Sequence, residues 1–369
     1  MDGNSFDFTA IRGIQAGSAY YVIMVPLKTV PRLFTFDDES MPPDLRAQRI
    51  LNKARIPAIA GYIVDNPSDY ILSSLCASID GEIVFEPVET EGPLRRVGKL
   101  RIDMGATILI NDGQHRRAAI EEAIRERPAL GDETISVVVF ADHGLKRSQQ
   151  MFADLNMHAV RPTKSIKLLY NHRDALAGLS RDLVAAIPLL RDFTSFDRTS
   201  LSNREVKFFT LSSVHQATAE LIGKKKAGKI DKKDLAFAIE FWTAVIQEMP
   251  DWQRIGTRDV TAFEMRRDYI HAHGVAVQAI ASAGAQLIAA RPDNWKEWLA
   301  RLREIDWSRR NRALWDNRAL VAGKLNKSKN NIILITNVIM RAFELPLSAE
   351  GQRVEDLYSP GALPLKVAS

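Results

Sequence analysis

The stretch ATILINDGQHRRAAIEEAI, residues 106–124, decides how the first part of this chain folds. Its apolar run Ile108–Ile110 predicts a strand, and Asn111-Asp112-Gly113 predicts a turn. The Ala-, Glu- and Arg-rich residues that follow predict a helix from Gly113 to about Arg127. A strand that passes through a glycine turn directly into a helix is typical of an α/β unit.

The first turn of this expected helix holds three polar side chains, Gln114, His115 and Arg116. Unpaired backbone N–H groups at a helix start, beside an imidazole and a guanidinium, suit a phosphate group. In the alternative interpretation, Asp112 or Asn111 only caps the helix and Gly113 only permits the turn. The residues alone leave both interpretations open.

The charge pattern favours the phosphate interpretation indirectly. Arg116 and Arg117 stand where cations oppose the helix dipole, which is unfavourable unless an anion balances them. Glu121 and Glu122 lie one turn further on and offer a competing explanation, because either could pair with a nearby arginine.

Composition indicates an ordinary globular protein. The chain has 369 residues, 46% of them hydrophobic and 26% charged, with a formal net charge of +5 that is compatible with a polyanionic partner. Its one cysteine, Cys76, excludes a disulfide framework and a cysteine-cluster metal site, and its apolar context indicates a core residue. With no signal-like N-terminus, and with residues 274–290 too short and polar to cross a bilayer, we expect a cytoplasmic, nucleoid-associated protein without membrane contact.

The chain changes character after Pro162. Before it, strands are expected at 20–27, 71–79, 83–85, 107–110 and 135–140, the last buried on both faces, with helices at 44–55 and from Pro57. After it, helical periodicity dominates, and all six tryptophans are expected to pack in the core. We therefore predict a mixed-sheet α/β domain at 1–170, a helical domain at 171–350 and a loosely held tail at 351–369.

Two further segments are rich in groups that bind phosphate. Residues 154–167 place Asn156, His158, Arg161, Lys164 and Lys167 around a helix start at Pro162, which predicts either a solvated polar loop or a second wall of a nucleotide or nucleic-acid site. Residues 301–341 carry ten Lys or Arg against three acids, a difference of +7. Within them, KLNKSKNN at 324–331 spaces its lysines before an apolar helix, which suits contacts with DNA phosphates.

Patterns of conventional catalysis are weak. The chain contains no HExxH, GxSxG or GxGxxG motif, and GKKKAGKI at 223–230 lacks the Ser or Thr of a P-loop. His271 and His273 are interpreted as core or surface histidines, so we expect no metal site.

The string Asp112-Gly113-Gln114-His115-Arg116 resembles the signature of the DGQHR-domain family, whose best-known members are the DndB proteins of bacterial DNA phosphorothioation systems. The resemblance extends over residues 10–345, because segments 47–83, 151–174, 207–214 and 323–337 look like DndB blocks in DndB order. It implies a distant ParB/sulfiredoxin-like relationship for the first domain. It also implies a DNA-binding repressor of the modification operon, whose partners are double-stranded promoter DNA and the modification enzymes.

From the resemblance and the residues together, we expect a homo-oligomeric regulator with two kinds of site. The nucleotide or phosphate site comprises Asp112, Gly113, Gln114, His115, Arg116, Asn156, His158 and Arg161. The DNA contacts comprise Arg46, Arg49, Lys53, Lys164, Lys167, Lys324, Lys327 and Lys329. The alternative is an ATPase that uses ATP with Mg²⁺, in which Asp112 or His115 positions water and Arg116 stabilises phosphoryl charge.

Overall fold

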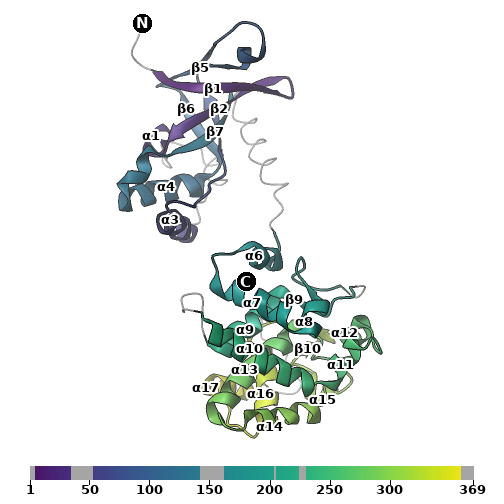
Figure 1. Cartoon of the computed structure of the whole chain (residues 1–369). Coiled ribbons are helices and arrows are strands. Elements are labelled where there is room, and N and C mark those ends of the chain that lie inside the picture. Colours follow the sequence, from purple (N-terminus) through teal and green to yellow (C-terminus); the bar gives the residue numbers. More distant parts are fainter. Residues whose placement is uncertain (1–4, 35–52, 142–161, 203–204, 224–229, 359–369) are drawn as a thin grey trace. The chain divides into compact units, whose positions relative to one another are not determined.

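The sheet of the first unit carries the turn at Gly113. The computed structural model describes residues 5–34, 53–141, 162–202, 205–223 and 230–358. Contacts divide the chain into two units, residues 1–160 and 161–369, and each is described by itself. Figure 1 shows the strands of the first unit in purple and blue and the helices of the second in green and yellow.

Seven strands of the first unit form one mixed sheet in the order β4-β5-β1-β2-β7-β3-β6. The strands are β1 (Ser5–Gln15), β2 (Ser18–Pro26), β3 (Leu75–Asp80), β4 (Ile83–Pro87), β5 (Val97–Asp103), β6 (Thr107–Asp112) and β7 (Thr134–Ala141). Neighbouring strands are antiparallel except β3 and β7, which run parallel. The prediction of a mixed α/β fold is confirmed, whereas the ParB-like relationship stays a prediction.

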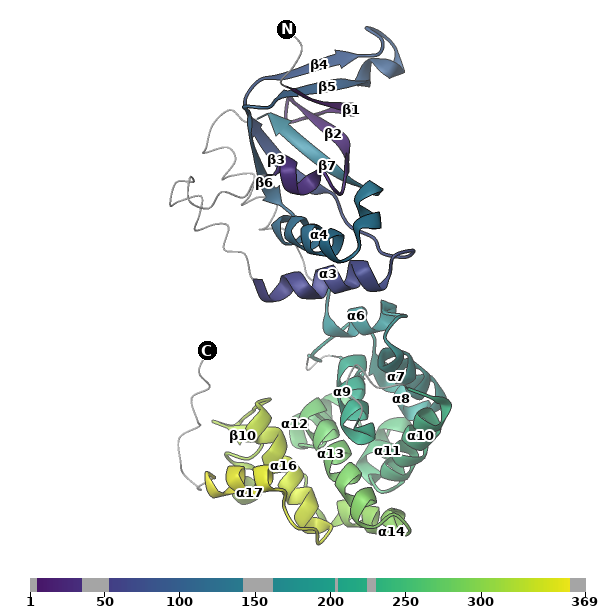
Figure 2. The same cartoon turned by 90° about the vertical axis from the view of Figure 1, so that its left-hand side faces the viewer.

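Helices cover one face of this sheet. They are α1 (Val30–Leu33), α3 (Ile56–Asp65) and α4 (Gln114–Glu126), with short 3₁₀ helices at Lys53–Arg55, Pro93–Arg96 and Pro128–Asp132. Pro57 stands in the first turn of α3, as predicted. Figure 2 shows α3 and α4 side by side beneath the sheet. Their apolar side chains, such as Ile63 and Ile120, join Val137 and Leu75 in one core.

The prediction that residues 135–140 are buried on both faces is wrong. Ile135, Val137 and Val139 are buried against the helices, whereas Ser136, Val138 and Phe140 are only half-buried. The described helices pack on the first face alone, so the alternate side chains of β7 keep partial contact with solvent. Strands β1 and β5 are absent from the sequence-based prediction, because their half-exposed alternation includes many polar residues.

The second unit is built almost entirely of helices. They are α6 (Lys164–Tyr170), α7 (Ala175–Ala186), α8 (Pro188–Phe193), α9 (Leu211–Ile222), α10 (Lys232–Gln247), α11 (Pro250–Gly256), α12 (Ala262–Asp268), α13 (Gly274–Ala290), α14 (Trp295–Leu299), α15 (Arg312–Trp315), α16 (Lys329–Ala342) and α17 (Ala349–Asp356), with a 3₁₀ helix at Ala300–Glu304. Two short strand pairs complete it, β8 (Thr194–Ser195) with β9 (Phe209–Thr210) and β10 (Leu320–Val321) with β11 (Lys324–Leu325).

Tryptophans form much of the core of this helical unit, as predicted. Trp242, Trp252 and Trp315 are fully buried, and Trp307 stacks on Trp315 with ring centroids 5.5 Å apart. The Trp252 Nε1–H donates to Nδ1 of His271, which is completely buried. The interpretation of His271 as a core histidine is therefore confirmed.

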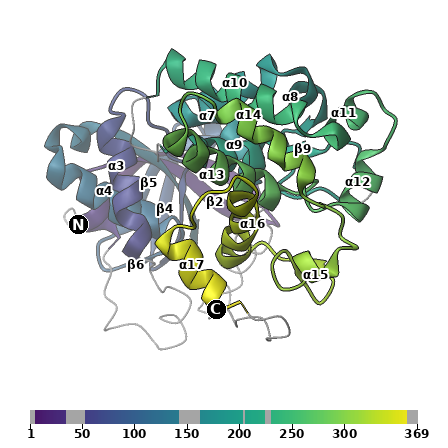
Figure 3. The same ribbon diagram turned by 90° about the horizontal axis from the view of Figure 1, so that it is seen from below.

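The boundaries of the helical unit differ from those expected. Helix α6, which we placed in the first domain, packs against α7 and α9. Residues 351–356, expected to be loosely held, belong to α17, where Val354 is buried and Glu355 binds Arg318. Figure 3 shows α17 lying beside α16. Within the described residues, no helix is both long and apolar enough to cross a membrane.

Candidate functional site

The turn at Gly113 joins β6 to α4 without a side-chain cap. Asp112 is the last residue of β6, and Gly113 is the residue before the first turn of α4, with φ of 104°. The N-cap residue of α4 is Gly113, which has no side chain, so neither Asp112 nor Asn111 occupies the N-cap position that the alternative interpretation gave them. Only glycine suits this position, since a Cβ atom here would lie 2.4 Å from Cδ2 of Leu75.

The arginines after this turn are balanced by the protein itself. Arg116 donates to the Asp112 carboxylate over 2.8 Å and to the backbone carbonyl of Ser74 over 3.1 Å. Arg117 donates to Glu121 over 2.8 Å and to the carbonyl of Pro31 over 3.0 Å. The expectation of uncompensated charge is therefore wrong, because each guanidinium has both a carboxylate and a carbonyl acceptor.

Other atoms around the turn keep hydrogen-bonding capacity. Asn111 is 1% exposed, and its Nδ2 has no partner in the described structure. The buried Nε of Arg116 is also without a partner there. Buried donors are normally paired, so unpaired ones mark a place where a ligand oxygen could bind. Gln114 instead turns inward and donates to the carbonyl of Ile110 over 3.4 Å.

The surroundings of His115 disfavour its protonated form. Burial, together with the charges of Arg55 and Arg116, lowers its pKa below the ordinary value, and only Asp112 opposes the shift. A neutral imidazole between two guanidinium groups can donate to or accept from a ligand. Burial and Asp112 also raise the pKa of the Cys76 thiol to about 12, which fits the predicted core role of this residue.

Several residues expected near this turn lie outside the described part of the chain. They are Asn156, His158 and Arg161 of the expected nucleotide site, and Arg46 and Arg49 of the expected DNA contacts. Lys53 begins the 3₁₀ helix before α3, and nothing is described of its side chain.

The helical unit brings three of the expected DNA contacts together. Lys164, Lys327 and Lys329 line one pocket of about 500 Å³, although 163 residues separate the first two. Lys167 on α6 and Lys324 on β11 do not line it. No acidic residue is among the described residues of its wall, which are Lys164, Thr199, Ser200, Leu201, Phe208, Thr210, Ser212, Ser213, Gln216, Arg266, Ala272, His273, Gly274, Val275, Gln278, Lys327, Lys329 and Ile332.

Helix starts supply much of the wall of this basic pocket. Ser212 and Ser213 begin α9, Gly274 and Val275 begin α13, and Lys329 begins α16. The start of α13 lies against that of α9, because a Cβ atom on Gly274 would come within 2.8 Å of Cβ of Ser213. No side chain caps α13; the Ala276 amide donates to the carbonyl of His273, and no hydrogen bond is described for the amides of Gly274 and Val275.

Two residues in the wall of the basic pocket, Arg266 and His273, were given no ligand-binding role from the sequence. Arg266 is 4% exposed; it donates to backbone carbonyls of 202–207, but its Nε has no partner within the described chain. His273 donates from Nε2 to the carbonyl of Arg266 over 3.0 Å. Burial, and the nearby charges of Arg309, Lys327 and Arg266, lower the pKa of His273 to about 4. The only sequence signal was the basic and polar run RRDYIHAHG at 266–274.

Nearly the whole chain is similar in sequence to a known protein family. A family model described as DndB, DNA-sulfur modification-associated, matches residues 8–346. The chain belongs to the DndB family. Membership associates this DndB-family chain with DNA sulfur modification, as the resemblance implied. Neither a curated protein nor a solved structure matches it.

Proposed function

We propose that this DndB-family protein is a DNA-binding regulator that represses a DNA sulfur-modification gene cluster. The observation that carries the proposal is the meeting of Lys164 and Lys327 at one pocket lined by helix starts. Both side chains are exposed, and neither has an ion-pair partner in the described structure. Lys329 lines the same pocket and pairs with Glu350 over 2.7 Å.

Unpaired lysines are better placed to bind DNA than the other cations of the basic segment 301–341. Arg301, Arg303, Arg312, Arg318 and Arg341 all pair with carboxylates. An arginine that already pairs with a carboxylate gains little binding free energy from a DNA phosphate. A lysine without such a partner gains more, because its binding to DNA releases a condensed counterion. Of the ten cations in this segment, Arg309, Arg310, Lys324 and Lys327 have no carboxylate partner in the described structure.

In this proposal, lysine contacts with phosphates supply affinity, and helix starts fix the position of the backbone on a rigid frame. The expected partner is double-stranded DNA from the promoter of the protein's own cluster, bound by a homo-oligomer. Association with the modification enzymes is part of the same proposal.

A gel-shift titration of the full chain tests the proposal, with the cluster's promoter compared with random DNA of equal length. Lys164→Ala with Lys327→Ala should weaken binding to both DNAs. The matched control is Lys28→Ala with Lys296→Ala, which removes the same charge from lysines paired with Asp132 and Glu240. Equal affinity for promoter and random DNA would contradict the repressor.

A second candidate function is ATP hydrolysis at the 112–116 turn. The unpaired donors of Asn111 and Arg116 and the lowered pKa of His115 favour it. In this alternative, Asp112 or His115 orients water and Arg116 stabilises phosphoryl charge. Phosphate release by wild-type protein, compared with His115→Ala, tests it, and equal rates at the background level would remove it.

A further inference from the structure

The basic pocket of the helical unit shares part of its wall with a second, smaller pocket. The second pocket has a volume of about 180 Å³, and both pockets are lined by Gln278, Lys329 and Ile332. Its other described wall residues are Glu220, Ser282, Gln286, Ile333, Thr336, Asn337, Met340, Ser348, Glu350 and Gly351. We refer to it below as the polar pocket.

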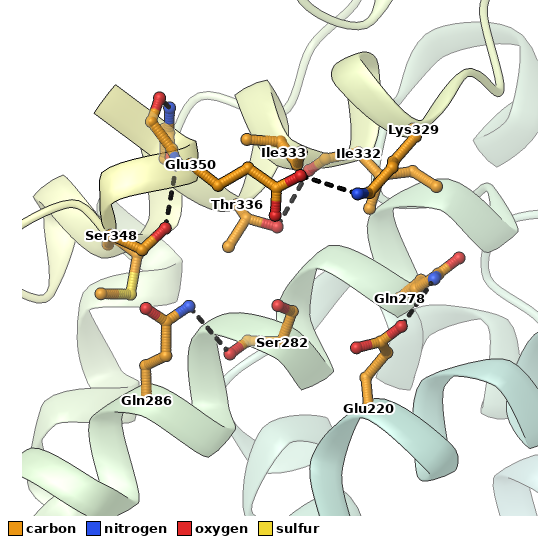
Figure 4. A pocket seen from close by; sticks show the side chains of 13 residues that line it. Glu220, Gln278, Ser282, Gln286, Lys329, Ile332, Ile333, Thr336, Ser348 and Glu350 are labelled. Atoms are coloured by element: carbon orange, nitrogen blue, oxygen red, sulfur yellow. Dashed lines mark hydrogen bonds and ion pairs between the residues drawn. The ribbon is translucent and has the colours of Figure 1, made fainter. Parts of the chain in front are cut away.

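A polar stripe on an apolar helix creates this second pocket. Gln278, Ser282 and Gln286 follow each other at intervals of four residues along α13, whose other residues are almost all Ala, Val, Ile, Leu or Gly. Residues four apart lie on one helix face. Figure 4 shows this stripe facing Ile332 and Thr336 of α16 across the pocket.

The described hydrogen bonds use only part of the hydrogen-bonding capacity of the two glutamines in this stripe. Gln286 donates to the carbonyl of Ser282 over 3.3 Å, one turn back on its own helix, and Gln278 donates to Glu220 over 3.3 Å. Each amide therefore retains donors or acceptors that no described hydrogen bond uses. Gln278, Ser282 and Gln286 are half-exposed, so the donors and acceptors that they retain are accessible to a ligand in the pocket.

The two pockets differ in chemistry in a way that matches the two ends of a nucleotide. The basic pocket offers Lys164, Lys327 and the uncapped start of α13, all suited to phosphate oxygens. The polar pocket offers amides and a hydroxyl beside Ile332 and Met340, which is typical of a site that reads the edge of a flat polar ring. Lys329, which lines both pockets, lies where the two ends would join.

We propose that the basic and polar pockets together bind one free nucleotide, with its phosphates in the basic pocket and its base in the polar pocket. This site lies in the helical unit and is separate from the 112–116 turn. A base-paired DNA duplex would use the basic pocket alone, because its stacked bases do not enter a pocket unless they are flipped out. The amides of α13 therefore favour a free nucleotide.

The test is calorimetric titration of DNA-free full-length protein with AMP, ADP, ATP and GTP, and with inorganic phosphate as a separate probe. Lys327→Ala should weaken binding of nucleotides and of phosphate about tenfold or more, because a charge-assisted hydrogen bond is lost. Gln286→Ala should weaken nucleotide binding about fivefold and leave phosphate binding unchanged. It should also alter the preference between adenine and guanine nucleotides.

Two controls identify the site. Lys28→Ala and Lys296→Ala each remove an exposed cation that lines neither pocket. Neither should change this binding event. The proposal would be overturned if Arg116→Ala abolished nucleotide binding while Lys327→Ala and Gln286→Ala left it intact. It would also be overturned if nucleotides bound no more tightly than inorganic phosphate. DNA binding by gel shift is measured separately, so either result stands without the other.

Discussion

Arg116 donates a hydrogen bond of 2.8 Å to the carboxylate of Asp112, from the first turn of α4 back to the last residue of β6. The same guanidinium reaches the carbonyl of Ser74, just before β3. Hydrogen bonds from one side chain therefore connect the start of α4 to the ends of two neighbouring strands. A ligand at this turn would bind beside a cation that is already positioned, in a site whose net charge Asp112 reduces.

The prediction that the 112–116 turn binds a nucleotide can be tested by replacing two adjacent arginines, Arg116 and Arg117, one at a time. If the 112–116 turn binds a nucleotide, Arg116→Ala should weaken that binding about tenfold or more, because a guanidinium contact with phosphate is lost. Arg117→Ala should not, because its guanidinium is directed to Glu121 and to the carbonyl of Pro31. Calorimetry with ATP on both variants gives the comparison, and equal losses would count against a site at the turn.

Gly113→Ala should destabilise the first unit by about 2 kcal/mol or more, because φ is positive and a Cβ atom would meet Leu75. Gly17→Ala provides the control: its φ is 76°, but no atom lies within 4 Å of the added Cβ. It should cost about 1 kcal/mol, from backbone strain alone. Urea denaturation of both variants measures the difference, and similar losses would show that the contact with Leu75 relaxes.

Salt dependence should reveal the role of the exposed lysines. Lys164→Ala with Lys327→Ala should lower the slope of log K against log salt by about 2, because about one counterion is released per lysine–phosphate contact. The charge-matched pair Lys28→Ala with Lys296→Ala should leave the slope unchanged. Fluorescence anisotropy with labelled DNA at several salt concentrations measures it. A parallel loss of slope in both double variants would indicate a general charge effect.

The ion pair between Arg318 and Glu355 should hold α17 in place. Their side chains are only 8% and 9% exposed, and Asn337 also donates to Glu355 over 2.8 Å. Glu355→Gln should cost about 3 kcal/mol, because it leaves Arg318 buried without a counter-charge. Glu350→Gln is the exposed control, and it should leave the protection of α17 nearly unchanged, because solvent screens an exposed ion pair. Hydrogen exchange of α17 amides reports local loss, and unchanged protection in Glu355→Gln would contradict this role.

Acid should weaken the same contact. Burial raises the pKa of Glu355, but the hydrogen bonds from Arg318 and Asn337 outweigh it and hold the pKa below its ordinary value of 4.5. The pair therefore contributes its full stability above about pH 4.5 and loses it as the pH falls through the lowered pKa of the folded state. α17 amides should lose protection in that range in wild-type protein, and Glu355→Gln should show less pH dependence.

His273 should make the helical unit sensitive to mild acid. Its pKa falls from 6.5 to about 4 on folding, so the unfolded chain takes up a proton before the folded one. Stability is complete above about pH 6.5 and declines as the pH falls toward 4, by on the order of 3 kcal/mol. His273→Gln should remove most of this decline in urea titrations at pH 7, 6 and 5. If the stability of His273→Gln falls with pH as much as that of the wild type, other groups, such as the buried His271, cause the loss.

Much of the fold follows from local patterns in the sequence. The apolar run before Asn111, the glycine and the Ala-rich stretch fix β6, the turn and α4 within one or two residues. Pro57 marks the start of α3, and the apolar spacing after Leu235 marks α10. Short-range signals of this kind depend on residues close in the chain, so they can be read without tertiary structure.

Pairing between charges could not be read in the same way. Arg116 and Arg117 looked unbalanced in the sequence, but their carbonyl acceptors, Ser74 and Pro31, lie 42 and 86 residues away. Likewise, Glu355 neutralises Arg318 from a segment that looked loosely held. Such partners are brought together only by folding, so composition overstates the charge that a surface offers.

By itself, the sequence determined the alternation of strands and helices, the change to a helical region after Pro162 and the DndB family. Tertiary structure alone decided which cations remain available. It placed Lys164 and Lys327 at one pocket with the start of α13, while it paired most arginines of 301–341 with carboxylates. The physical reason is that secondary structure follows from neighbouring residues, whereas an anion site requires several helix starts and side chains to converge from distant parts of the chain.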